Sequence, residues 1–404
     1  MILNAIFGSL AVLSFALLIW QWIAARRFPL HRRIADTSFA PAVTLLKSLK
    51  GADAATEDCL RSWFAQDYGG EVQILFGVVS ESDPVCEIVR KLMREFPRRD
   101  TQLVVCPTLI GANAKVSKLA ELETAAKHEI IVVSDADVRV PADFLANAVA
   151  PLKNSAAGLV NCFYRLANPS TLAMEWEAIA INADFWSQVL QSQSLKPLDF
   201  ALGAVMLTRR AQLAEIGGFA TLADCLADDY ELGNRIARKG HKIVLCPVVV
   251  ECWDAPMNWR AVWKHQLRWA RTIRVCQPAP YFFSILSNAG FWASVWFVVG
   301  LFGIRGHQVA SAVTENGAHF SDVHVDMIPG AFFIGGLFIL ARIFIGGDLQ
   351  RRLNQDSKTK SYHWLVPIKD LLQTAIWLCA FAGNTIEWRG QRFQLKKDGT
   401  LVKK

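Results

Sequence analysis

Apolar positions along this chain follow two patterns: long runs near its ends and short runs between them. From about residue 40 to residue 250, short apolar runs alternate with stretches of helical periodicity. This alternation predicts an α/β domain built on a mostly parallel sheet. The predicted strands are 43–46, 72–79, 103–106, 130–133, 159–163, 204–207 and 243–245. The predicted helices are 58–66, 85–96, 114–126, 230–239 and 259–274.

The first long apolar run, residues 2–25, is long enough to cross a membrane as a helix. A secretory signal peptide is the competing interpretation, but no lysine or arginine precedes the run, and the run exceeds a typical signal core. We therefore expect residues 1–25 to be a retained transmembrane anchor. Arginines follow at positions 26, 27, 32 and 33, so the positive-inside rule makes the polar region after the anchor cytoplasmic.

Two later runs, 281–304 and 328–345, are also long enough to span a membrane. The stretch 305–327 between them carries Glu315, Asp322 and Asp326 against Arg305, which suits the outer face. A return to the cytoplasm is marked by Arg351, Arg352, Lys358 and Lys360.

The last apolar stretch, 364–383, is interrupted by Lys369-Asp370 and is followed by a strongly basic tail. A full crossing would place that tail outside, against the charge rule, so we expect a re-entrant or interfacial segment. The predicted organisation is an anchor (1–25), a cytoplasmic α/β domain (38–277), a membrane region (281–384) and a basic cytoplasmic tail (385–404).

Composition narrows the class of protein further. Hydrophobic residues make up 52% of the 404 positions, which agrees with a chain that lies partly in lipid. The net charge of +7 is not arranged as a basic stripe with interleaved aromatics, so we expect no nucleic-acid partner and assign the basic residues to lipid headgroups. The nine cysteines show no Cys-x-x-Cys spacing, which is typical of a reducing compartment.

Acidic residues follow two of the predicted strands. Asp83 comes after strand 72–79, and Asp135 and Asp137 come after strand 130–133. Ligands gather at the carboxyl ends of strands in an open α/β sheet, so these sites should face one crevice. Asp-x-Asp after a buried strand suits Mg²⁺ or Mn²⁺ carrying a diphosphate. Asp83 could accept a hydrogen bond from a uracil imide. The alternative is that Asp83 has only a structural role in the turn before Pro84.

A second acidic pair, Asp228-Asp229, begins the predicted helix 230–239. Acids at this position often only complement the helix dipole. Two adjacent carboxylates also raise each other's proton affinity, which suits a general base, and Asp229 is the residue we assign to that role.

Cationic and aromatic residues gather on the amphipathic helix 259–274. Arg268 can bind a leaving phosphate bidentately, and Trp269 offers a flat apolar wall for a sugar or lipid chain. A snorkelling cation beside an interfacial aromatic is the alternative. Lys115, which opens another helix after Gly111-Ala112-Asn113-Ala114, could lie near the phosphates.

The ordered set of motifs resembles membrane glycosyltransferases of the GT-A fold and, more closely, the ceramide glucosyltransferase family, glycosyltransferase family 21. The resemblance runs from the N-terminal anchor almost to the end of the chain. It is carried by 45–51 (LLKSLKG), 66–68 (QDY), Asp83-Pro84, Gly111-x-Asn113-x-Lys115, Ser134-Asp135, Arg139-Val140, Asp228-Asp229-Tyr230, Arg268-Trp269 and 388–390 (WRG).

This resemblance implies an inverting transferase that uses a UDP-sugar and a membrane lipid alcohol. It assigns Asp83 to the nucleotide, Asp135 and Asp137 to the metal-diphosphate, and Asp229 to the base. It places Lys115, Asp135 and Arg268 at the donor, and Asp228, Gln266 and Trp269 at the acceptor or closing motif. An inner-membrane location in a bacterium, with the site facing the cytoplasm, is the expected setting.

Three positions depart from the family pattern. His265 stands where the closing motif begins with Gln or Arg, while Gln266 is one place off; Lys118 replaces an Asn. Asp137 stands where animal ceramide glucosyltransferases have Gly, and bacterial relatives that glycosylate hopanoids look very similar. From the family resemblance, the first prediction is the transfer of glucose from UDP-glucose to ceramide. The alternative is the transfer of N-acetylglucosamine from UDP-N-acetylglucosamine to a hopanoid lipid. A polysaccharide synthase and a non-enzymatic membrane scaffold are the remote alternatives.

Overall fold

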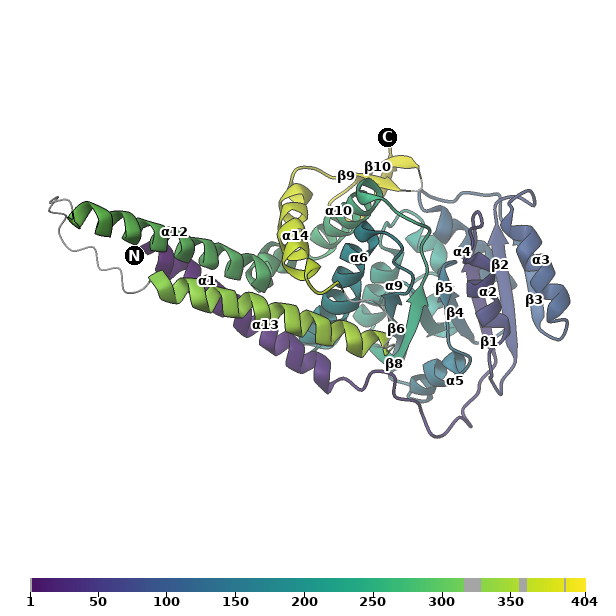
Figure 1. Ribbon diagram of the computed structural model, residues 1–404. Coiled ribbons are helices and arrows are strands. Elements are labelled where there is room, and N and C mark those ends of the chain that lie inside the picture. Colours follow the sequence, from purple (N-terminus) through teal and green to yellow (C-terminus); the bar gives the residue numbers. More distant parts are fainter. Residues whose placement is uncertain (1, 316–327, 356–361, 389) are drawn as a thin grey trace.

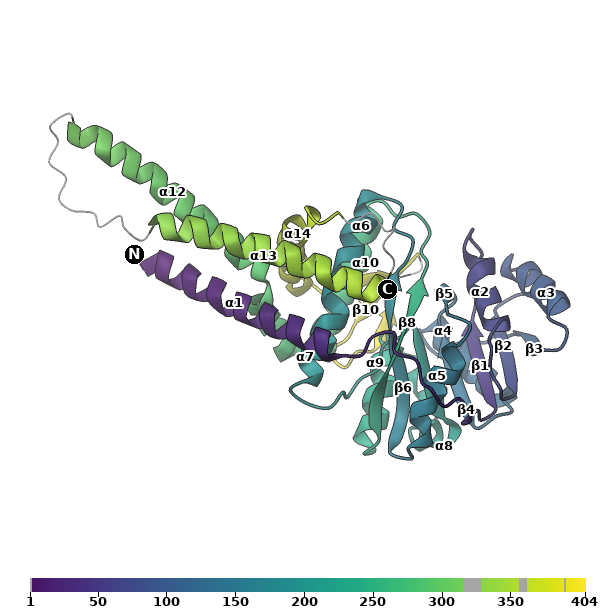
Figure 2. The same ribbon diagram turned by 60° about the horizontal axis from the view of Figure 1, so that its bottom comes forward.

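The computed structural model describes residues 2–315, 328–355, 362–388 and 390–404, and the side chains of 303–315 and 328 are outside that description. An α/β body occupies one end of the molecule, and three long helices project from it (Figures 1 and 2). The predictions that rest on the side chains of Arg305 and Glu315, and those that rest on Asp322, Asp326, Lys358, Lys360 and Arg389, lie outside this description.

Eight strands of the described chain form one mixed sheet in the order β3-β2-β1-β4-β7-β6-β8-β5. Their bounds are β1 Val43–Ser48, β2 Val72–Val78, β3 Asp100–Val105, β4 Ile130–Ser134, β5 Val138–Arg139, β6 Ala157–Leu166, β7 Val205–Arg209 and β8 Lys242–Cys252. All seven predicted strands are present. The expectation of a mostly parallel sheet is confirmed for six of these eight strands, whereas β7, antiparallel to β4 and β6, and β5, antiparallel to β8, run the other way. Buried apolar runs read the same in either direction, so periodicity cannot orient a strand.

Helices cover both faces of this sheet. Alternate residues of β1 and β4 enter two different cores: Leu46 and Ile131 lie in one, and Leu45 and Val132 in the other. This period-two division is what a sheet covered on both sides requires. The covering helices are α2 Thr56–Phe64, α3 Val85–Glu95, α4 Ala114–Ala125, α5 Phe144–Val149, α8 Arg210–Glu215 and α9 Asp228–Arg238.

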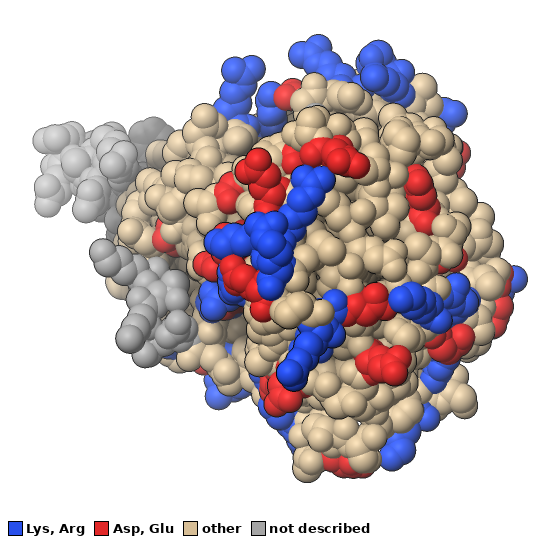
Figure 3. All heavy atoms as spheres, turned by 90° about the vertical axis from the view of Figure 1, so that its right-hand side faces the viewer, with Lys and Arg blue, Asp and Glu red and all other residues tan. Residues whose placement is uncertain are grey.

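Charges of both signs are interspersed on the face farthest from the long helices (Figure 3). Ion pairs there join α2 to α3, with Lys91 Nζ 2.8 Å from Glu57 Oε1 and Arg61 Nη1 2.5 Å from Glu95 Oε2. Exposed pairs of this kind contribute little to stability. They cover this edge of the domain without forming a patch of one sign.

A long broken helix, which the sequence patterns did not predict, crosses the junction between the body and the long helices. It consists of α6 Leu172–Ile179, a π-helical turn η2 Ala180–Phe185, and α7 Trp186–Gln193. Its residues are buried on nearly every side, so no clean apolar stripe marks it as amphipathic. We call it the junction helix.

The projecting helices are α1 Ile2–Arg27, α12 Ala289–Glu315 and α13 Ile328–Asn354. Among the described residues, two helices are long and apolar enough to cross a membrane, Ile2–Arg27 and Pro329–Asn354. A third is possible if the bent pair Pro278–Ser287 and Ala289–Phe302 counts as one span. The predicted span 281–304 falls on this bent pair and stays a prediction: the helix bends by 45° where Asn288 Oδ1 accepts from Phe291 N.

The ends of α1 and α13 that meet the body carry arginines. Arg26 Nη1 lies 2.9 Å from Asp348 Oδ2, and His31 Nε2 lies 3.0 Å from the Arg352 carbonyl oxygen. Both helices therefore present their basic ends to the α/β body (Figure 2). Phe15 stacks on Phe338 with 4.2 Å between ring centroids, which packs the two helices along their length.

Four further helical segments complete the described part of the molecule before the C-terminal tail. Helix α10 Trp259–Cys276 leads into α11 Pro278–Phe283 and η4 Ser284–Ser287. Helix α14 Leu365–Phe381 has 17 residues and is not among the candidate spans, so its relation to a bilayer stays a prediction.

The basic tail is ordered, which the sequence patterns did not indicate. It forms an antiparallel sheet of β9 Thr385–Trp388, β10 Gln391–Leu395 and β11 Leu401–Lys403. Leu401 N donates to Asp224 O at 2.8 Å, and Phe393 and Leu395 pack on Leu226. The tail is thereby fastened to the loop that precedes α9.

Candidate active site

The start of α4 is fastened to the loop before α9. Asn113 is the N-cap: its Oδ1 accepts from the backbone N–H groups of Lys115 (3.0 Å) and Val116 (3.2 Å). Its Nδ2 donates to Cys225 O at 2.9 Å. A capping side chain satisfies helix donors that otherwise lack partners. Here it also brings Lys115 to the acidic pair at the head of α9.

Lys115 bridges two of the predicted acidic sites. Its Nζ lies 2.7 Å from Asp135 Oδ1 and 3.0 Å from Asp228 Oδ2, and the lysine is 8% exposed. Burial alone would lower the pKa of Lys115, but Asp135 and Asp228 outweigh it and raise that pKa. Residues more than ninety positions apart in sequence therefore meet at one buried cation.

Asp229 lies directly beside this bridge. Its Oδ1 accepts from the Tyr230 backbone N–H at 2.8 Å. Burial, followed by the charge of Asp228, raises the pKa of Asp229 to about 6. A Cβ on Gly203 would lie 2.6 Å from Asp229 Oδ2, so a glycine at that position makes room for the carboxylate. An acid with this pKa is more basic than an ordinary aspartate and remains ionised near neutral pH.

Asp137 lines a pocket of about 300 Å³ next to the same cluster. The pocket is also lined by Gly51, Val85 and Trp253. Burial, then the charges of Asp135 and Asp254, raise the pKa of Asp137 to about 7. A hydrogen bond from its own backbone N–H acts in the opposite direction.

Lys47 stabilises the end of β4 through hydrogen bonds to Ser134 and Asp135. It is fully buried on β1, and its Nζ donates to Asp135 O at 2.6 Å and Ser134 Oγ at 3.1 Å. Burial lowers the pKa of Lys47 to about 8, while nearby acidic groups, including Asp137 and Asp135, oppose that shift. This lysine holds the backbone that carries the Asp-x-Asp pair.

Asp83 sits at the rim of the pocket and does not line it. Its Oδ1 and Oδ2 each accept from Gly51 N at 3.0 Å, and Oδ1 also accepts from Val85 N at 3.1 Å. Gly51 has φ +70°, a conformation that favours glycine. Both backbone groups belong to pocket-lining residues. Asp83 therefore shapes the pocket rim, and direct contact with a uracil ring stays a prediction.

Helix α10 is fastened to the junction helix through one carboxylate. Glu177 on α6 is fully buried, and its Oε1 lies 2.7 Å from His265 Nδ1 and accepts from Gln266 Nε2 at 2.8 Å. Gln266 is 5% exposed, so the structure places it in the helix packing, where it anchors α10. A direct role of Gln266 at the acceptor stays a prediction.

An aromatic wall joins α10 to the acidic cluster. Its ring centroids follow one another from Tyr164 to Phe185 (5.5 Å), to Trp269 (6.2 Å) and to His265 (4.9 Å). Burial raises the pKa of Tyr164, and the charges of Asp229 and Asp135 act in the same direction. The tyrosine end of the wall therefore lies within electrostatic range of both carboxylates.

Arg268 approaches the site from α10 through Asp254. Burial raises the pKa of Asp254, whereas Arg268 and His265 act in the opposite direction. Arg268 also lines a second pocket of about 170 Å³ between α10 and the C-terminal sheet, together with Arg271 and Arg392. Arg268 and Asp137 therefore both lie within electrostatic range of the half-buried Asp254.

The structure brings most of the predicted residues together. Asp135, Asp228, Asp229 and Lys115 form one cluster with Asp137 at its edge, while Trp269 and Arg268 reach it through the aromatic wall and Asp254. Sequence reasoning missed Lys47, Tyr164, Glu177, Gly203 and Asp254. A glutamate at 177 inside an otherwise apolar helical stretch was the one available signal, because a buried charge needs a partner.

The carboxylates of Asp135 and Asp137 suit a divalent cation whose coordination shell is completed by a bound phosphate ligand. Among the described residues no group of three or more His, Cys, Asp and Glu could enclose a metal. Asp135 and Asp137 nevertheless supply hard oxygens; burial and then the charge of Asp135 raise the pKa of Asp137, and a cation would relieve both. Magnesium is commonly held by one or two carboxylates, with phosphates and waters completing its shell. Asp135 and Asp137 suit that arrangement.

Comparisons with known proteins find related sequences and a related fold. The model of glycosyl transferase family 21 matches residues 6–320 and 318–401. Ceramide glucosyltransferase 3 of Caenorhabditis elegans is 24% identical over 243 residues, which cover 59% of this chain and 52% of the relative. The ceramide glucosyltransferase of Candida albicans is 31% identical over 131 residues, which cover 30% of this chain and 24% of the relative. The chain spans about half, or less, of the length of these relatives.

One solved structure has a comparable fold over nearly the whole chain. It is the mannosyltransferase PcManGT from Pyrobaculum calidifontis in complex with GDP-Man and Mn²⁺, with a TM-score of 0.51 and 19% sequence identity. The likeness covers 94% of this chain and 98% of that one. At this identity the match concerns the fold alone, and it confirms the predicted α/β architecture of the GT-A type.

Proposed function

The chain belongs to glycosyltransferase family 21, and from this premise we propose that it is an inverting membrane glycosyltransferase. It moves a sugar from a UDP-sugar to a hydroxyl of a membrane lipid. We propose UDP-glucose as donor and ceramide as acceptor, giving glucosylceramide. The observation that carries the proposal is the Lys115 bridge between Asp135 and Asp228, which sets Asp229 beside the Asp-x-Asp pair. The names of the matched relatives support the choice of substrates.

Asp229 acts as the general base in this proposal. Its carboxylate takes the proton from the lipid hydroxyl, and the freed oxygen attacks the anomeric carbon of the sugar. The bond from that carbon to the diphosphate oxygen breaks, and UDP leaves with the electron pair. Attack from the face opposite the leaving group inverts the configuration. A pKa of about 6 suits this role, because the group is ionised at neutral pH yet holds a proton well.

Cations on the donor side bind and orient the diphosphate. Lys115 Nζ could contact a phosphate oxygen, but two carboxylates already surround this ammonium group, so a divalent cation would have to offset the added negative charge. Arg268 offers a planar fork that matches phosphate oxygens. A magnesium or manganese ion held by Asp135 and Asp137 would neutralise charge on the leaving diphosphate. The pocket beside Gly51 and Asp137 is the place we assign to the nucleotide.

The membrane setting follows from the long helices in this proposal. Candidate spans α1 and α13 meet the body at their basic ends, beside the junction helix (Figure 2). We propose that the α/β body lies on the cytoplasmic side, which the positive-inside rule favours, and that the membrane is the inner membrane of a bacterium. The lipid hydroxyl then reaches Asp229 from the inner leaflet.

The test uses the full chain in lipid nanodiscs with each radiolabelled donor in turn: UDP-glucose, UDP-N-acetylglucosamine and UDP-galactose. Ceramide and a hopanoid alcohol are supplied separately, and the products are separated and identified by mass spectrometry. We expect label in glucosylceramide. Label in an N-acetylglucosaminyl hopanoid would replace both substrates while keeping the reaction class. No labelled lipid from any combination, together with no UDP binding, would reject the proposed function.

A further inference from the structure

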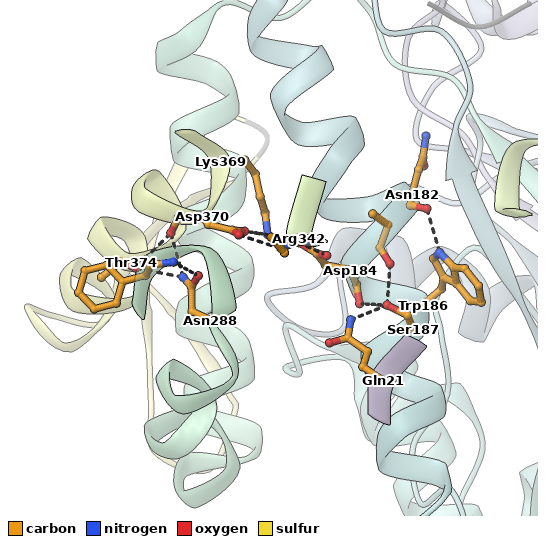
Figure 4. A network of polar contacts seen from close by, with 12 residues as sticks. Gln21, Asn182, Asp184, Trp186, Ser187, Asn288, Arg342, Lys369, Asp370 and Thr374 are labelled. Atoms are coloured by element: carbon orange, nitrogen blue, oxygen red, sulfur yellow. Dashed lines mark hydrogen bonds and ion pairs between the residues drawn. The ribbon is translucent and has the colours of Figure 1, made fainter. Parts of the chain in front are cut away.

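Four charged side chains form a buried quartet at the junction of the body and the long helices (Figure 4). Arg342 Nη2 lies 2.9 Å from Asp184 Oδ2, and its Nε donates to Asp370 Oδ2 at 2.8 Å. Lys369 Nζ contacts Asp184 and lies 3.2 Å from Asp370 Oδ1. All four are at most 5% exposed.

The members of the quartet come from three different elements. Arg342 lies within the candidate span α13, Lys369 and Asp370 lie on α14, and Asp184 lies on the π-helical turn of the junction helix. Ion pairs buried like this cost desolvation energy that well-packed apolar residues would avoid. An ionisable residue inside an apolar span is by default a functional one, and π-turns are rare and frequent at functional sites.

Close packing fixes the register of the surrounding helices on the quartet. A Cβ on Gly290 of α12 would lie 2.0 Å from Asp370 Oδ2, so α12 can approach only because that residue is glycine. Asn288 donates to Asp370 O at 2.9 Å, at the bend where α12 begins. On α1, Gln21 Nε2 donates to Ser187 Oγ at 2.6 Å. The projecting helices are thus all tied to the junction helix or to the quartet.

The junction helix carries the acceptor side of the candidate site on its other face. Phe185, which follows Asp184 directly, lies in the aromatic wall against Trp269. Glu177, two turns earlier, holds His265 and Gln266 on α10. Two consecutive residues of the π-turn therefore contact different regions. Asp184 pairs with Arg342 on α13 and Lys369 on α14, and Phe185 packs in the aromatic wall between Tyr164 and Trp269.

We infer that Asp184 and Arg342 are positioning residues for the lipid acceptor. Their ion pair holds the junction helix against α13 and α14. The junction helix in turn holds the aromatic wall in the position where it guides the lipid hydroxyl toward Asp229. The inference rests on the proposed function and adds a specific consequence. Loosening the pair should weaken use of the acceptor while leaving the donor side, built on β4, α4 and α9, intact.

Two matched double variants separate positioning from stability. D184N/K369M removes one charge of each sign and leaves the neutral pair Arg342–Asp370, which frees the junction helix. D370N/K369M also removes one charge of each sign but leaves Arg342–Asp184, which keeps the tie. Both variants avoid the unpaired buried charge that a single substitution would create. Each is made in the full chain and assayed in nanodiscs with UDP-glucose and ceramide.

We expect D184N/K369M to lower kcat/KM for ceramide by about 100-fold, the loss that a misplacement of about 1 Å can cause. Its KM for UDP-glucose and its slow hydrolysis of UDP-glucose without ceramide should match wild type. D370N/K369M should stay near wild type in all three. The inference is overturned if the two variants lose acceptor use equally, or if D184N/K369M loses hydrolysis as much as transfer. A wild-type chain that neither binds UDP nor hydrolyses UDP-glucose would instead reject the proposed function.

Discussion

The molecule contains two buried clusters of charge, and they differ in balance. The acidic cluster of the candidate site holds Asp135, Asp137, Asp228 and Asp229 against two ammonium groups, Lys115 and Lys47. The quartet holds two carboxylates against two cations, and every member is paired with a member of opposite charge. The acidic cluster borders a pocket of about 300 Å³, whereas the quartet is enclosed by helices.

The difference shows what each cluster can do. Burial, together with an excess of negative charge beside the pocket, raises the carboxylate pKa values of Asp229 and Asp137, so the cluster can take up a cation or a proton. A charge-balanced cluster whose members pair with one another lacks that excess of negative charge, and its pairs hold the surrounding elements in position. Removing one charge should therefore have opposite consequences in the two regions: lost chemistry in the first, lost stability in the second.

The largest effect on rate should come from Asp229→Asn. Loss of a general base lowers turnover by about 10²–10⁴-fold, while UDP binding should persist because the donor side is untouched. Turnover and UDP affinity are measured on the same preparation. Glu231→Gln, two residues along α9 in a surface pair with Arg235, is the matched control and should retain activity. Strong residual transfer in the Asp229 variant would remove it as the base.

The quartet should respond in the opposite way. Arg342→Met leaves Asp184 and Asp370 facing Lys369 alone, and an uncompensated buried charge costs about 3–5 kcal/mol. We expect a large fall in thermal stability in detergent. R342M/D370N restores neutrality and should recover most of it. A single variant as stable as wild type would mean that the quartet contributes nothing to holding the helices.

Asp137→Asn tests the unbalanced cluster without touching the base. The divalent metal concentration needed for half-maximal transfer should rise by about tenfold or more, since a ligand oxygen loses its charge. Stability of the metal-free protein should rise at neutral pH. A carboxyl whose pKa is higher in the folded than in the unfolded chain binds its proton more tightly when folded, so its ionisation above that pKa opposes folding. An unchanged metal requirement would exclude Asp137 as a ligand.

The smallest effect should be a shift in pH dependence. With saturating metal, kcat/KM should fall as the pH drops through about 6, where Asp229 takes up its proton. Asp228→Asn removes the neighbouring charge that helps raise this pKa, so the acidic limb should move to lower pH. Burial remains the larger cause, so the limb should stay above the ordinary aspartate value of 3.8. An unmoved limb would assign it to another group.

Several features followed from local patterns alone. All seven predicted strands formed because short buried apolar runs need no distant information to be recognised. Asp135 and Asp137 end their strand as expected, and Asn113 caps α4 so that Lys115 enters the site. The motifs also indicated the family that the comparisons confirm.

Other features depend on contacts between distant residues. The direction of β7, the bend at Asn288 and the ordered tail each result from packing against elements far away in sequence. In the sequence, Lys369-Asp370 interrupts the apolar stretch 364–383. In the structure it is 2–4% exposed and paired with Arg342 and Asp184, which the sequence places 27 or more positions away.

By itself, the sequence determined the alternating α/β pattern, the apolar helices and the acids at the strand ends, because each of these is set by neighbours along the chain. Only the tertiary structure decided which charges are balanced. Balance depends on which side chains become neighbours after folding, and on how much water their burial excludes. That is why the same residue types form a candidate reaction centre beside Lys115 and a structural tie around Arg342.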